Sequence, residues 1–324
     1  MTTVQLANLD VVVTGAHPGH VLKTADPNAW ADLEARHLSA LLQGAHWSLV
    51  QTVAEEGPQD GRAQALIQAH HWIDQDTWPD AAWRTAQWQG IQAWVTPCHW
   101  HMAQGQTLML DPHDLKLDDA SSMALMSAMQ PYFEGDGLQL HWHDALNWRL
   151  SGPALQAWPS HTLQQVIGRD VQIPLSTSVW PMPLSRLHIE MQMLLYTHPL
   201  NEARAQQGLP SVNSFWVHGV GQWPATQAPS SSEPVVWLKD ELESAWRTGG
   251  PNAWRSAWRE LDETLAPALL AQLEAGTSVR LHWCAPHSWR SASLLPHRAA
   301  GRRWSWPWSD PQAHLRRHLQ ALSP

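Results

Sequence analysis

The stretch WRSAWRELDETLAPALLAQLEAGTSVRLHWC, residues 254–284, decides the fold. Its apolar side chains recur on one face of a helix, at Trp254, Trp258, Leu261, Leu265, Leu269 and Leu273. Gly276 predicts the end of this helix, and Pro267 predicts a kink within it. From 278 to 283 apolar and polar residues then alternate, which is the pattern of a half-buried strand. A helix that leads directly into a strand is typical of an α/β fold.

The composition excludes several classes of protein. In 324 residues, 44% are hydrophobic and 15% charged, so the chain can bury a large core. A net charge of −9 argues against nucleic acid as a partner. The two cysteines, Cys98 and Cys284, are too few for a disulfide framework, and we expect both to be buried and unreactive. Without a signal-peptide pattern or an apolar run of about 18 residues, we expect a cytoplasmic protein with no membrane partner.

Tryptophan and histidine are unusually abundant, with 23 and 20 residues against two Phe and two Tyr. Trp142 and Trp283 fall on apolar strand faces, as Trp254 and Trp258 fall on the helix face. This placement predicts that tryptophan replaces other aromatic residues in the core. The alternative is a carbohydrate- or peptide-binding module with exposed stacking platforms, for which Trp304, Trp306 and Trp308 and the Trp-Pro steps at Trp78, Trp158, Trp180, Trp223 and Trp306 are the candidates.

Patterns elsewhere place further helices and strands. Residues 9–14 predict a strand and residues 27–42 a helix. Residues 119–129 predict a helix that stops near Pro131, and residues 185–196 predict an amphipathic helix.

Metal-capable side chains cluster at Cys98-His-Trp-His101, with Asp111 shortly after. On an extended backbone His99 and His101 point to the same side and could share a metal, but in a chain so rich in histidine the favoured alternative is that they line a polar surface or serve the structure. The turn at residues 17–20, HPGH, offers at most two further ligands or two exposed histidines. No glycine-rich nucleotide loop and no Gly-x-Ser-x-Gly segment occurs.

Residues 194–204, LLYTHPLNEAR, and residues 208–221, GLPSVNSFWVHGVG, form the most specific motif. The order His-Pro-x-Asn-x-x-Arg, Gly-x-x-Pro, Asn and Gly-x-Gly resembles a segment of archaeal-type cofactor-independent phosphoglycerate mutases, which belong to the alkaline-phosphatase superfamily. The chain as a whole is also similar to the RpfE-type family of bacterial regulatory proteins, which are phosphoglycerate mutase-like. Weaker matches extend from about residue 91 to 287.

The resemblance implies an α/β protein with two lobes. Residues 1–90 and 222–324 would form a degenerate alkaline-phosphatase-like core, and residues 91–221 an inserted α+β lobe. It also implies a ligand cleft lined by Asn201, Arg204, Asn213, His218, Gly219 and Gly221. The alternative is structural: Asn201 caps a helix, Arg204 pairs with an acid, and the glycines only turn the chain.

The departures from the mutase pattern bear on activity. Pro286 stands where the mutases carry the aspartate of Asp-His-Ser, and His218 stands in place of an arginine. Residues 1–90 show no equivalent of the mutases' Asp-Gly metal loop or serine nucleophile. We therefore expect a non-catalytic regulatory or ligand-binding protein, with a small phosphorylated or carboxylate ligand or a protein as its partner.

The alternative is an active metal-dependent phosphomutase or phosphatase acting on a small phosphorylated acid. It would bind a divalent metal (Mn, Zn or Fe), and the candidate ligands are His99, His101, Asp111, His198 and His287. The sequence assigns no catalytic residue.

Overall fold

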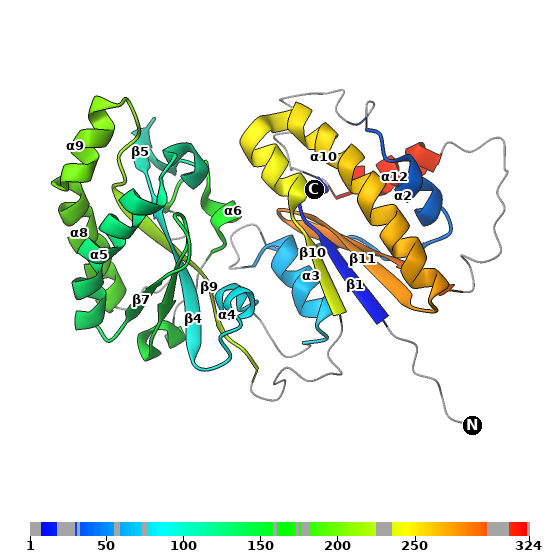
Figure 1. The fold of residues 1–324 in the computed structure, drawn as a ribbon, viewed down its shortest axis with the longest axis horizontal. Helices are drawn as coiled ribbons and strands as arrows, with labels where there is room; N and C mark the ends of the chain where they lie inside the picture. Colours follow the sequence, from blue (N-terminus) through cyan, green and yellow to red (C-terminus); the bar gives the residue numbers. More distant parts are fainter. Residues whose placement is uncertain are drawn as a thin grey trace. The chain divides into compact units, whose positions relative to one another are not determined.

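The computed structural model describes residues 8–17, 30, 33–54, 59–72, 77–157, 161–172, 175, 182–224, 235–296 and 311–322. The fold is α/β, with one mixed sheet and two antiparallel sheets among the described residues (Figure 1). It divides into two compact units. Unit 1 comprises Met1–Glu55, Asp60–Gln75 and Ser231–Pro324, and unit 2 comprises Glu56–Gln59 and Asp76–Ser230.

Unit 1 is built on a six-stranded sheet. Its strands are β1 (Asn8–Val13), β2 (His46–Trp47), β3 (Gln51–Thr52), β10 (Val235–Lys239), β11 (Ser278–Ala285) and β12 (Ser288–Leu294). The order is β10-β1-β11-β12-β2, and β3 also pairs with β12. β1 runs parallel to both neighbours, whereas β11 and β12 form an antiparallel hairpin.

The two faces of this sheet differ in polarity. One face carries Leu9, Val11 and Val13 of β1 and packs in one apolar core with three helices, α2 (Arg36–Leu42), α10 (Glu241–Glu274) and α12 (Pro311–Gln320). The alternate residues of β1, β11 and β12 point to the other face, which α3 (Gly61–Ala69) covers. That face carries buried polar side chains and becomes the candidate site below.

The stretch that decides the fold, residues 254–284, forms the second half of α10 and most of β11. Trp254 and Trp258 are fully buried in the core, as the helical periodicity predicts. The backbone leaves helical geometry at Gly250 (φ 64°), whereas Pro267 lies inside continuous helix. The kink expected at Pro267 stays a prediction, and the break at Gly250 uses glycine's freedom at positive φ.

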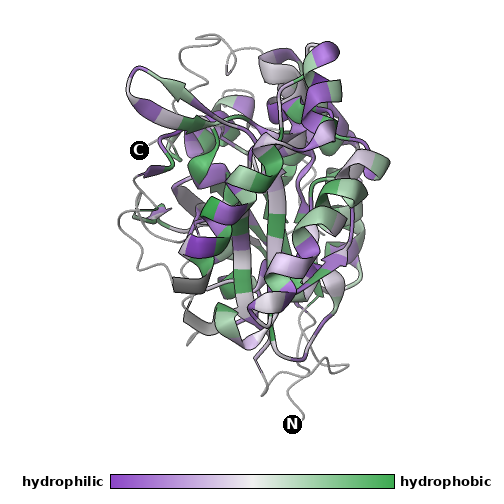
Figure 2. Ribbon diagram, turned by 90° about the vertical axis from the view of Figure 1, so that its left-hand side faces the viewer, coloured by the Kyte–Doolittle hydropathy of each residue, from purple (hydrophilic) through white to green (hydrophobic). Residues whose placement is uncertain are grey.

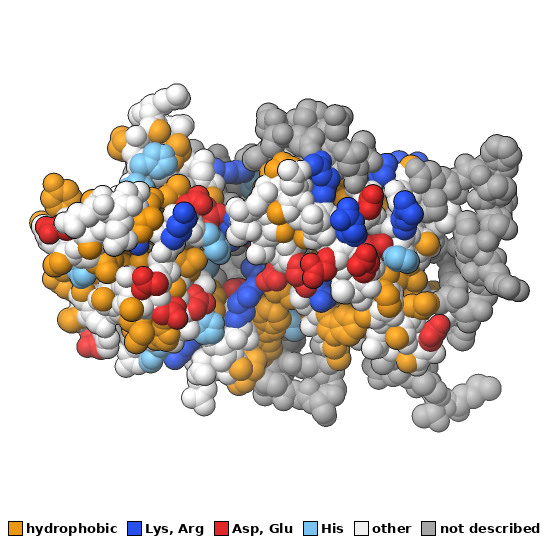
Figure 3. All heavy atoms as spheres, turned by 45° about the horizontal axis from the view of Figure 1, so that its top comes forward, with side chains coloured by type: hydrophobic (Ala, Val, Ile, Leu, Met, Phe, Trp, Pro, Cys, Tyr) orange, Lys and Arg blue, Asp and Glu red, His pale blue; other side chains and the backbone are white. Residues whose placement is uncertain are grey.

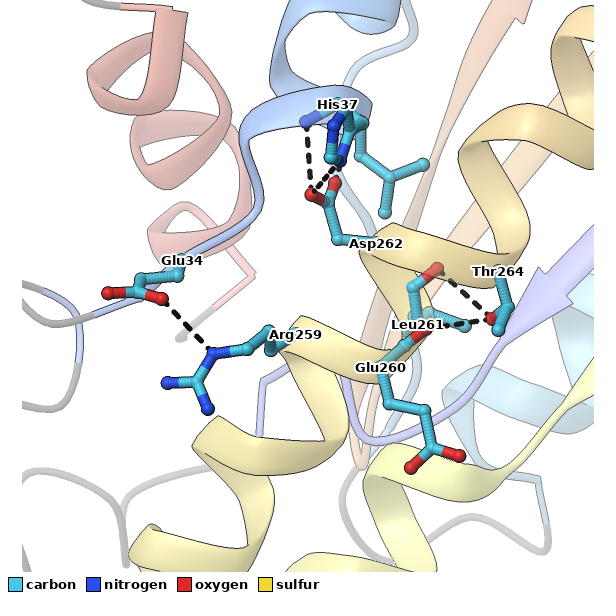
Figure 4. A network of polar contacts seen from close by, with 8 residues as sticks. Glu34, His37, Arg259, Glu260, Leu261, Asp262 and Thr264 are labelled. Carbon is cyan, nitrogen blue, oxygen red and sulfur yellow. Dashed lines mark hydrogen bonds and ion pairs between the residues drawn. The ribbon is translucent and has the colours of Figure 1, made fainter.

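A buried carboxylate on α10 holds the start of α2 (Figure 4). Asp262 Oδ1 accepts from the Leu38 N–H at 2.6 Å, and Oδ2 accepts from the His37 N–H at 3.0 Å and lies 2.9 Å from His37 Nδ1. Beside it, Arg259 Nε lies 3.1 Å from Glu34 Oε2. These contacts tie two segments of unit 1 that are far apart in sequence.

Unit 2 has a four-stranded antiparallel sheet in the order β7-β8-β4-β9. Its strands, with those of a separate hairpin β5–β6, are β4 (Ile91–Cys98), β5 (Trp100–Ala103), β6 (Gln106–Met109), β7 (Gln139–Trp142), β8 (Trp148–Ser151) and β9 (Ser214–Gln222). The α-helices are α4 (Asp80–Thr85), α5 (Asp119–Gly135), α6 (Leu163–Val166), α8 (Met182–Tyr196) and α9 (Pro199–Gln206). Short 3₁₀ helices occupy Pro112–Leu115 and Pro153–Ala157.

The core of unit 2 lies between one face of this sheet and helices α5 and α8. Helix α4 packs on β4 and β9. Green and pale segments alternate along the strands in Figure 2, as expected for strands with one apolar face. Cys98 and Cys284 are both buried, as predicted, and burial raises the pKa of each thiol.

Several predicted boundaries change. The helix expected over 27–42 begins at Arg36, although residues 18–29 and 31–32 lie outside the described part of the chain. Helix α5 continues through Pro131 to Gly135, with the proline on its exposed side, where freed carbonyls can meet water. Within the described ranges, no helix is both long and apolar enough to span a membrane.

Candidate functional site

The mutase-like segment of unit 2 is built around polar side chains that bond to backbone. Asn201 Nδ2 donates to the carbonyls of Leu195 and Val212 at 2.7 and 2.8 Å. Its Oδ1 accepts from the Val212 N–H at 2.8 Å. His198, not Asn201, caps α9, since His198 Nδ1 accepts from the Leu200 N–H at 3.2 Å. The expected capping role of Asn201 is therefore wrong, and its amide instead joins α8 to the strand side of the segment.

The side chains of Arg204 and Asn213 also form hydrogen bonds to backbone groups. Arg204 is 5% exposed, and its guanidinium donates to the carbonyls of Pro210 (2.8 Å) and Leu115 rather than to an acid. Asn213 accepts from the Trp100 N–H and donates to the Trp100 carbonyl, both at 2.8 Å. The side chain of Asn213 thus acts as an extra pair of backbone hydrogen bonds.

The Gly-x-Gly of the motif makes room for α4. Gly219 (φ 62°) and Gly221 lie within β9 rather than in a turn. A Cβ on Gly219 would lie 3.1 Å from Asp80 Cβ, and one on Gly221 would lie 2.7 Å from Pro79 Cβ. His218 directly precedes Gly219, and its Nε2 lies 2.9 Å from Thr96 Oγ1 on the neighbouring strand β4. A ligand at these six motif positions stays a prediction.

The predicted metal ligands are spread over different surroundings. His99 and His101 lie side by side, with ring centroids 6.0 Å apart, and His99 Nδ1 donates to the Ser211 carbonyl at 2.8 Å. Asp111 Oδ1 lies 2.9 Å from His113 Nδ1, and His198 caps α9. His287 belongs to unit 1, in the turn between β11 and β12. Over the described ranges, no group of three or more His, Cys, Asp or Glu side chains is arranged to hold a metal ion.

The remaining candidates from the sequence are the histidines of the HPGH turn and the tryptophans proposed as stacking platforms, and most of them lie outside the described residues. His17 is buried, and its ring centroid lies 5.2 Å from that of Trp30, whereas His20 is not described. Trp158, Trp180, Trp304, Trp306 and Trp308 also lie outside the described residues. On the face in Figure 3, Lys and Arg are scattered among acidic and hydrophobic side chains, with no broad basic surface.

A group of buried and half-buried polar side chains lies in unit 1, on the α3 side of the sheet. Register places Asp10 of β1 beside Arg280 of β11, and His282 of β11 beside Ser291 of β12. Residues paired in register share a face, so these four side chains gather on three adjacent strands. Helix α3 packs on these strands, its N-terminus capped by Asp60 and joined to the β11–β12 turn by the Gly61 N–H, which donates to the Pro286 carbonyl at 3.1 Å.

Asp10 and His282 are both fully buried. His282 Nε2 lies 2.7 Å from Asp10 Oδ1, and His282 Nδ1 lies 3.0 Å from Ser291 Oγ. Arg280 Nε lies 3.2 Å from the same carboxylate oxygen. Asp10 Oδ2 has no hydrogen-bond partner in the described part of the chain. A buried carboxylate oxygen without a partner is costly, which is a reason to look for a function at this position.

Burial also sets the protonation of the nearby histidines. Burial lowers the pKa of His282, although Asp10 opposes the shift by its hydrogen bond and its charge. Burial lowers the pKa of His70, at the end of α3, to about 4, again against the opposing charge of Asp10. Both imidazoles are therefore neutral near pH 7.

A pocket of about 390 Å³ opens onto this group. It is lined by Asn8, Leu9, Asp10, Ser48, Gln68, Ser278, Val279, Arg280, Ser291, Ser293, Leu294 and Leu295. Arg280 is the cation among these residues, and hydroxyls and amides supply most of the other polar groups. The sequence did not predict this site. The available signal was an aspartate inside the apolar run Leu9-Asp-Val-Val-Val13, where a charge needs a partner.

Comparisons with known proteins bear on the fold. No protein-family model matches the chain, and no curated protein matches its sequence. Among solved structures, the PH0037 protein from Pyrococcus horikoshii aligns over 90% of this chain and 87% of that chain, with a TM-score of 0.51 and 12% identity. The cofactor-independent phosphoglycerate mutase from Thermoplasma acidophilum DSM 1728 aligns over 90% of each chain, with a TM-score of 0.35 and 12% identity. The first likeness shows a shared fold.

Proposed function

We propose that this protein is a phosphoglycerate mutase-like relative, of the RpfE-type regulatory kind, that binds a small phosphorylated or carboxylate acid and does not catalyse the mutase reaction. The motif of residues 194–221 supports the relationship, since it follows the mutase order. The use of its polar side chains supports the loss of mutase activity. The side chains of Asn201, Arg204 and Asn213 all bond to this chain's own backbone.

The observation that carries the ligand proposal is the contrast between two arginines. The Arg204 guanidinium is buried and donates to two carbonyls. Arg280, in contrast, has its side chain 31% exposed at the wall of a pocket, where its Nε pairs with Asp10. A guanidinium binds carboxylate or phosphate oxygens through two parallel hydrogen bonds. The serine hydroxyls and the amides of Asn8 and Gln68 are further donors for such a ligand.

Titration calorimetry of the full chain with 3-phosphoglycerate and with inorganic phosphate tests the proposal. We expect binding to the wild type and at least tenfold weaker binding to Arg280→Gln. Arg259→Gln is the matched control, because Arg259 is a surface arginine of unit 1 paired with Glu34. The affinity of this variant for the probes should equal that of the wild type. Equal affinity in Arg280→Gln, or no binding of either probe, would contradict the ligand assignment. Steady conversion of 3- to 2-phosphoglycerate by the wild type would contradict the loss of mutase activity.

A second candidate function is the metal-dependent phosphomutase or phosphatase. The proximity of His99 and His101, with ring centroids 6.0 Å apart, favours it, because the bond from His99 Nδ1 to the Ser211 carbonyl leaves Nε2 as the acceptor of that ring. Elemental analysis of protein purified without a histidine tag distinguishes the candidates. Mn, Zn or Fe near one equivalent, lost in His99→Ala, would favour this second function, whereas metal far below stoichiometry would remove its basis.

A further inference from the structure

Ser291, His282 and Asp10 form a continuous hydrogen-bonded chain across β12, β11 and β1. The two links measure 3.0 Å from Ser291 Oγ to His282 Nδ1 and 2.7 Å from His282 Nε2 to Asp10 Oδ1. A hydroxyl, an imidazole and a carboxylate in this order are the parts of an activated serine nucleophile, which is recognised by geometry and not by position in the sequence.

The direction of each hydrogen bond follows from the chemistry of the groups. The carboxylate of Asp10, paired with Arg280, can only accept. The His282 ring, neutral because burial lowers its pKa, therefore carries its proton on Nε2 and donates it to Asp10. Nδ1 is left with a lone pair, and the Ser291 hydroxyl donates to it. This is the tautomer in which a histidine can take a proton from serine.

The nucleophile is placed at a pocket wall and is held rigidly. Ser291 lines the 390 Å³ pocket together with Arg280, whereas His282 lies behind them, fully buried. The Ser291 N–H donates to Ser48 Oγ at 2.9 Å, and the Ser291 carbonyl accepts from the Ser48 N–H at 2.9 Å. A hydrogen-bonded network that only stabilised the fold would not need to lie beside a pocket.

We infer that this pocket is an acyl-transfer site in which Ser291 is the nucleophile, His282 the general base and Asp10 the positioning residue. The substrate class is an ester of a small carboxylic acid. Ser291 Oγ forms a bond to the ester carbonyl carbon while its proton passes to His282 Nδ1. The bond from that carbon to the alcohol oxygen then breaks, and the alcohol leaves with the proton from His282. Water repeats the sequence, releasing the acid and restoring Ser291.

Charge that develops on the carbonyl oxygen during attack needs a partner in the pocket. Arg280 is the cation that lines it, two residues before His282 on the same face of β11. A fixed positive group at that position lowers the barrier to the tetrahedral intermediate. The inference goes beyond the proposed ligand function and does not depend on binding of a phosphorylated acid.

Covalent labelling of the full chain with a fluorophosphonate tests the inference. Attack by an activated serine displaces fluoride, so we expect one adduct per chain, located at Ser291 by peptide mass mapping of the wild type. This readout needs no variant to fold. Ser291→Ala should lose the adduct, and Ser244→Ala, which changes an exposed serine of α10 in the same unit, should label as the wild type does.

The role of the base is tested separately. His282→Gln should slow labelling by at least about 100-fold, with its fold checked by circular dichroism. Wild-type labelling should fall as pH is lowered, because a protonated imidazole cannot take the serine proton. Hydrolysis of p-nitrophenyl acetate should follow the same order of variants. No adduct on folded wild-type protein, an adduct at another serine, or equal rates in a folded His282→Gln would overturn the inference.

Discussion

Asn213 shows how a single side chain can do the work of backbone. Its amide pairs with both the N–H and the carbonyl of Trp100 and extends the pairing at the end of β4. We expect Asn213→Ala to leave both groups without partners and to lower the free energy of unfolding by about 2–4 kcal/mol. Urea unfolding of the full chain measures the change.

Asn252→Ala is the control for this substitution. Asn252 is exposed and accepts one hydrogen bond from Arg255 on its own helix. Its loss should change the unfolding free energy by no more than about 0.5 kcal/mol. Equal effects of the two substitutions would show that Asn213 does not hold the segment together.

His188 makes the stability of the protein depend on pH. It is 8% exposed, lies 3.1 Å from Ser214 Oγ, and burial lowers its pKa from 6.5 to about 4. Between these pH values the unfolded chain binds a proton that the folded chain does not. The unfolding free energy therefore falls as pH is lowered from about 6.5 towards 4, by up to about 3 kcal/mol from this residue.

Replacing the imidazole separates this contribution from that of other groups. His188→Gln keeps a polar partner for Ser214 but cannot titrate. We expect a shallower loss of stability between pH 7 and 4.5 than in the wild type, measured by urea unfolding at each pH. Parallel pH profiles for the two proteins would rule out His188 as a source of the dependence.

At the residue scale, the sequence indicates which side chains are special but not what they contact. The motif made Asn201, Arg204 and Asn213 conspicuous, yet their partners are backbone groups that no side-chain pattern reveals. Asp10 was harder to recognise, because its partners are 270 and 272 positions away, as the residue numbers of Arg280 and His282 show. Such a pairing becomes visible only once β1 and β11 are known to be neighbours.

Helix α4 and strand β9 illustrate an element contact that depends on glycine. A Cβ added at Gly221 would lie 2.7 Å from Pro79 Cβ and 2.9 Å from Pro79 Cα. Gly221→Ala should push the start of α4 off the strand and destabilise the protein by about 1–3 kcal/mol. Thermal unfolding measures the effect.

Gly135→Ala is the matched control. Gly135 ends α5, no φ in the left-handed region is involved, and a Cβ there would meet no atom within 4 Å. Alanine should be neutral or stabilising by up to about 1 kcal/mol. A Gly221→Ala protein as stable as Gly135→Ala would show that α4 does not need the close approach.

At the element scale, the spacing of apolar residues predicts the type and position of most elements that depend on local sequence alone. Helix spacing of apolar residues predicts α8 and the second half of α10, and a short run rich in valine predicts β1. Periodicity does not predict a segment whose conformation depends on packing against a neighbouring element. Gly219 and Gly221 read as a turn, but the packing of α4 keeps them within a strand.

At the scale of the whole molecule, the α/β class could be predicted from the order of elements, and the sheets and helices of the structure agree with it. The site in unit 1 could not be predicted. It needs β1, β11 and β12 to lie side by side, and strand order is set by long-range packing rather than by local pattern. The polar face of that sheet is visible only once the apolar face has been assigned to α2, α10 and α12.

The large number of tryptophans allows burial in the core to be tested on the whole protein by fluorescence. Among the described residues every tryptophan is buried or half-buried, and Trp148, Trp216, Trp254, Trp258 and Trp283 are among the most deeply buried side chains. Several contact one another, as do Trp258 and Trp283 with ring centroids 5.6 Å apart. Tryptophan thus fills the core positions that other proteins give to Phe, Tyr or Leu.

Core placement has a spectroscopic consequence, because an indole away from water emits at shorter wavelength and is shielded from small quenchers. We expect the folded protein to emit well to the blue of free tryptophan and acrylamide to quench only a minor part of the signal. Guanidinium unfolding is the internal control: it should shift the emission to the red and make most of it quenchable. Strong quenching of most of the signal in the folded protein would instead favour exposed tryptophan platforms for sugars or peptides, and would contradict the assignment of tryptophan to the core.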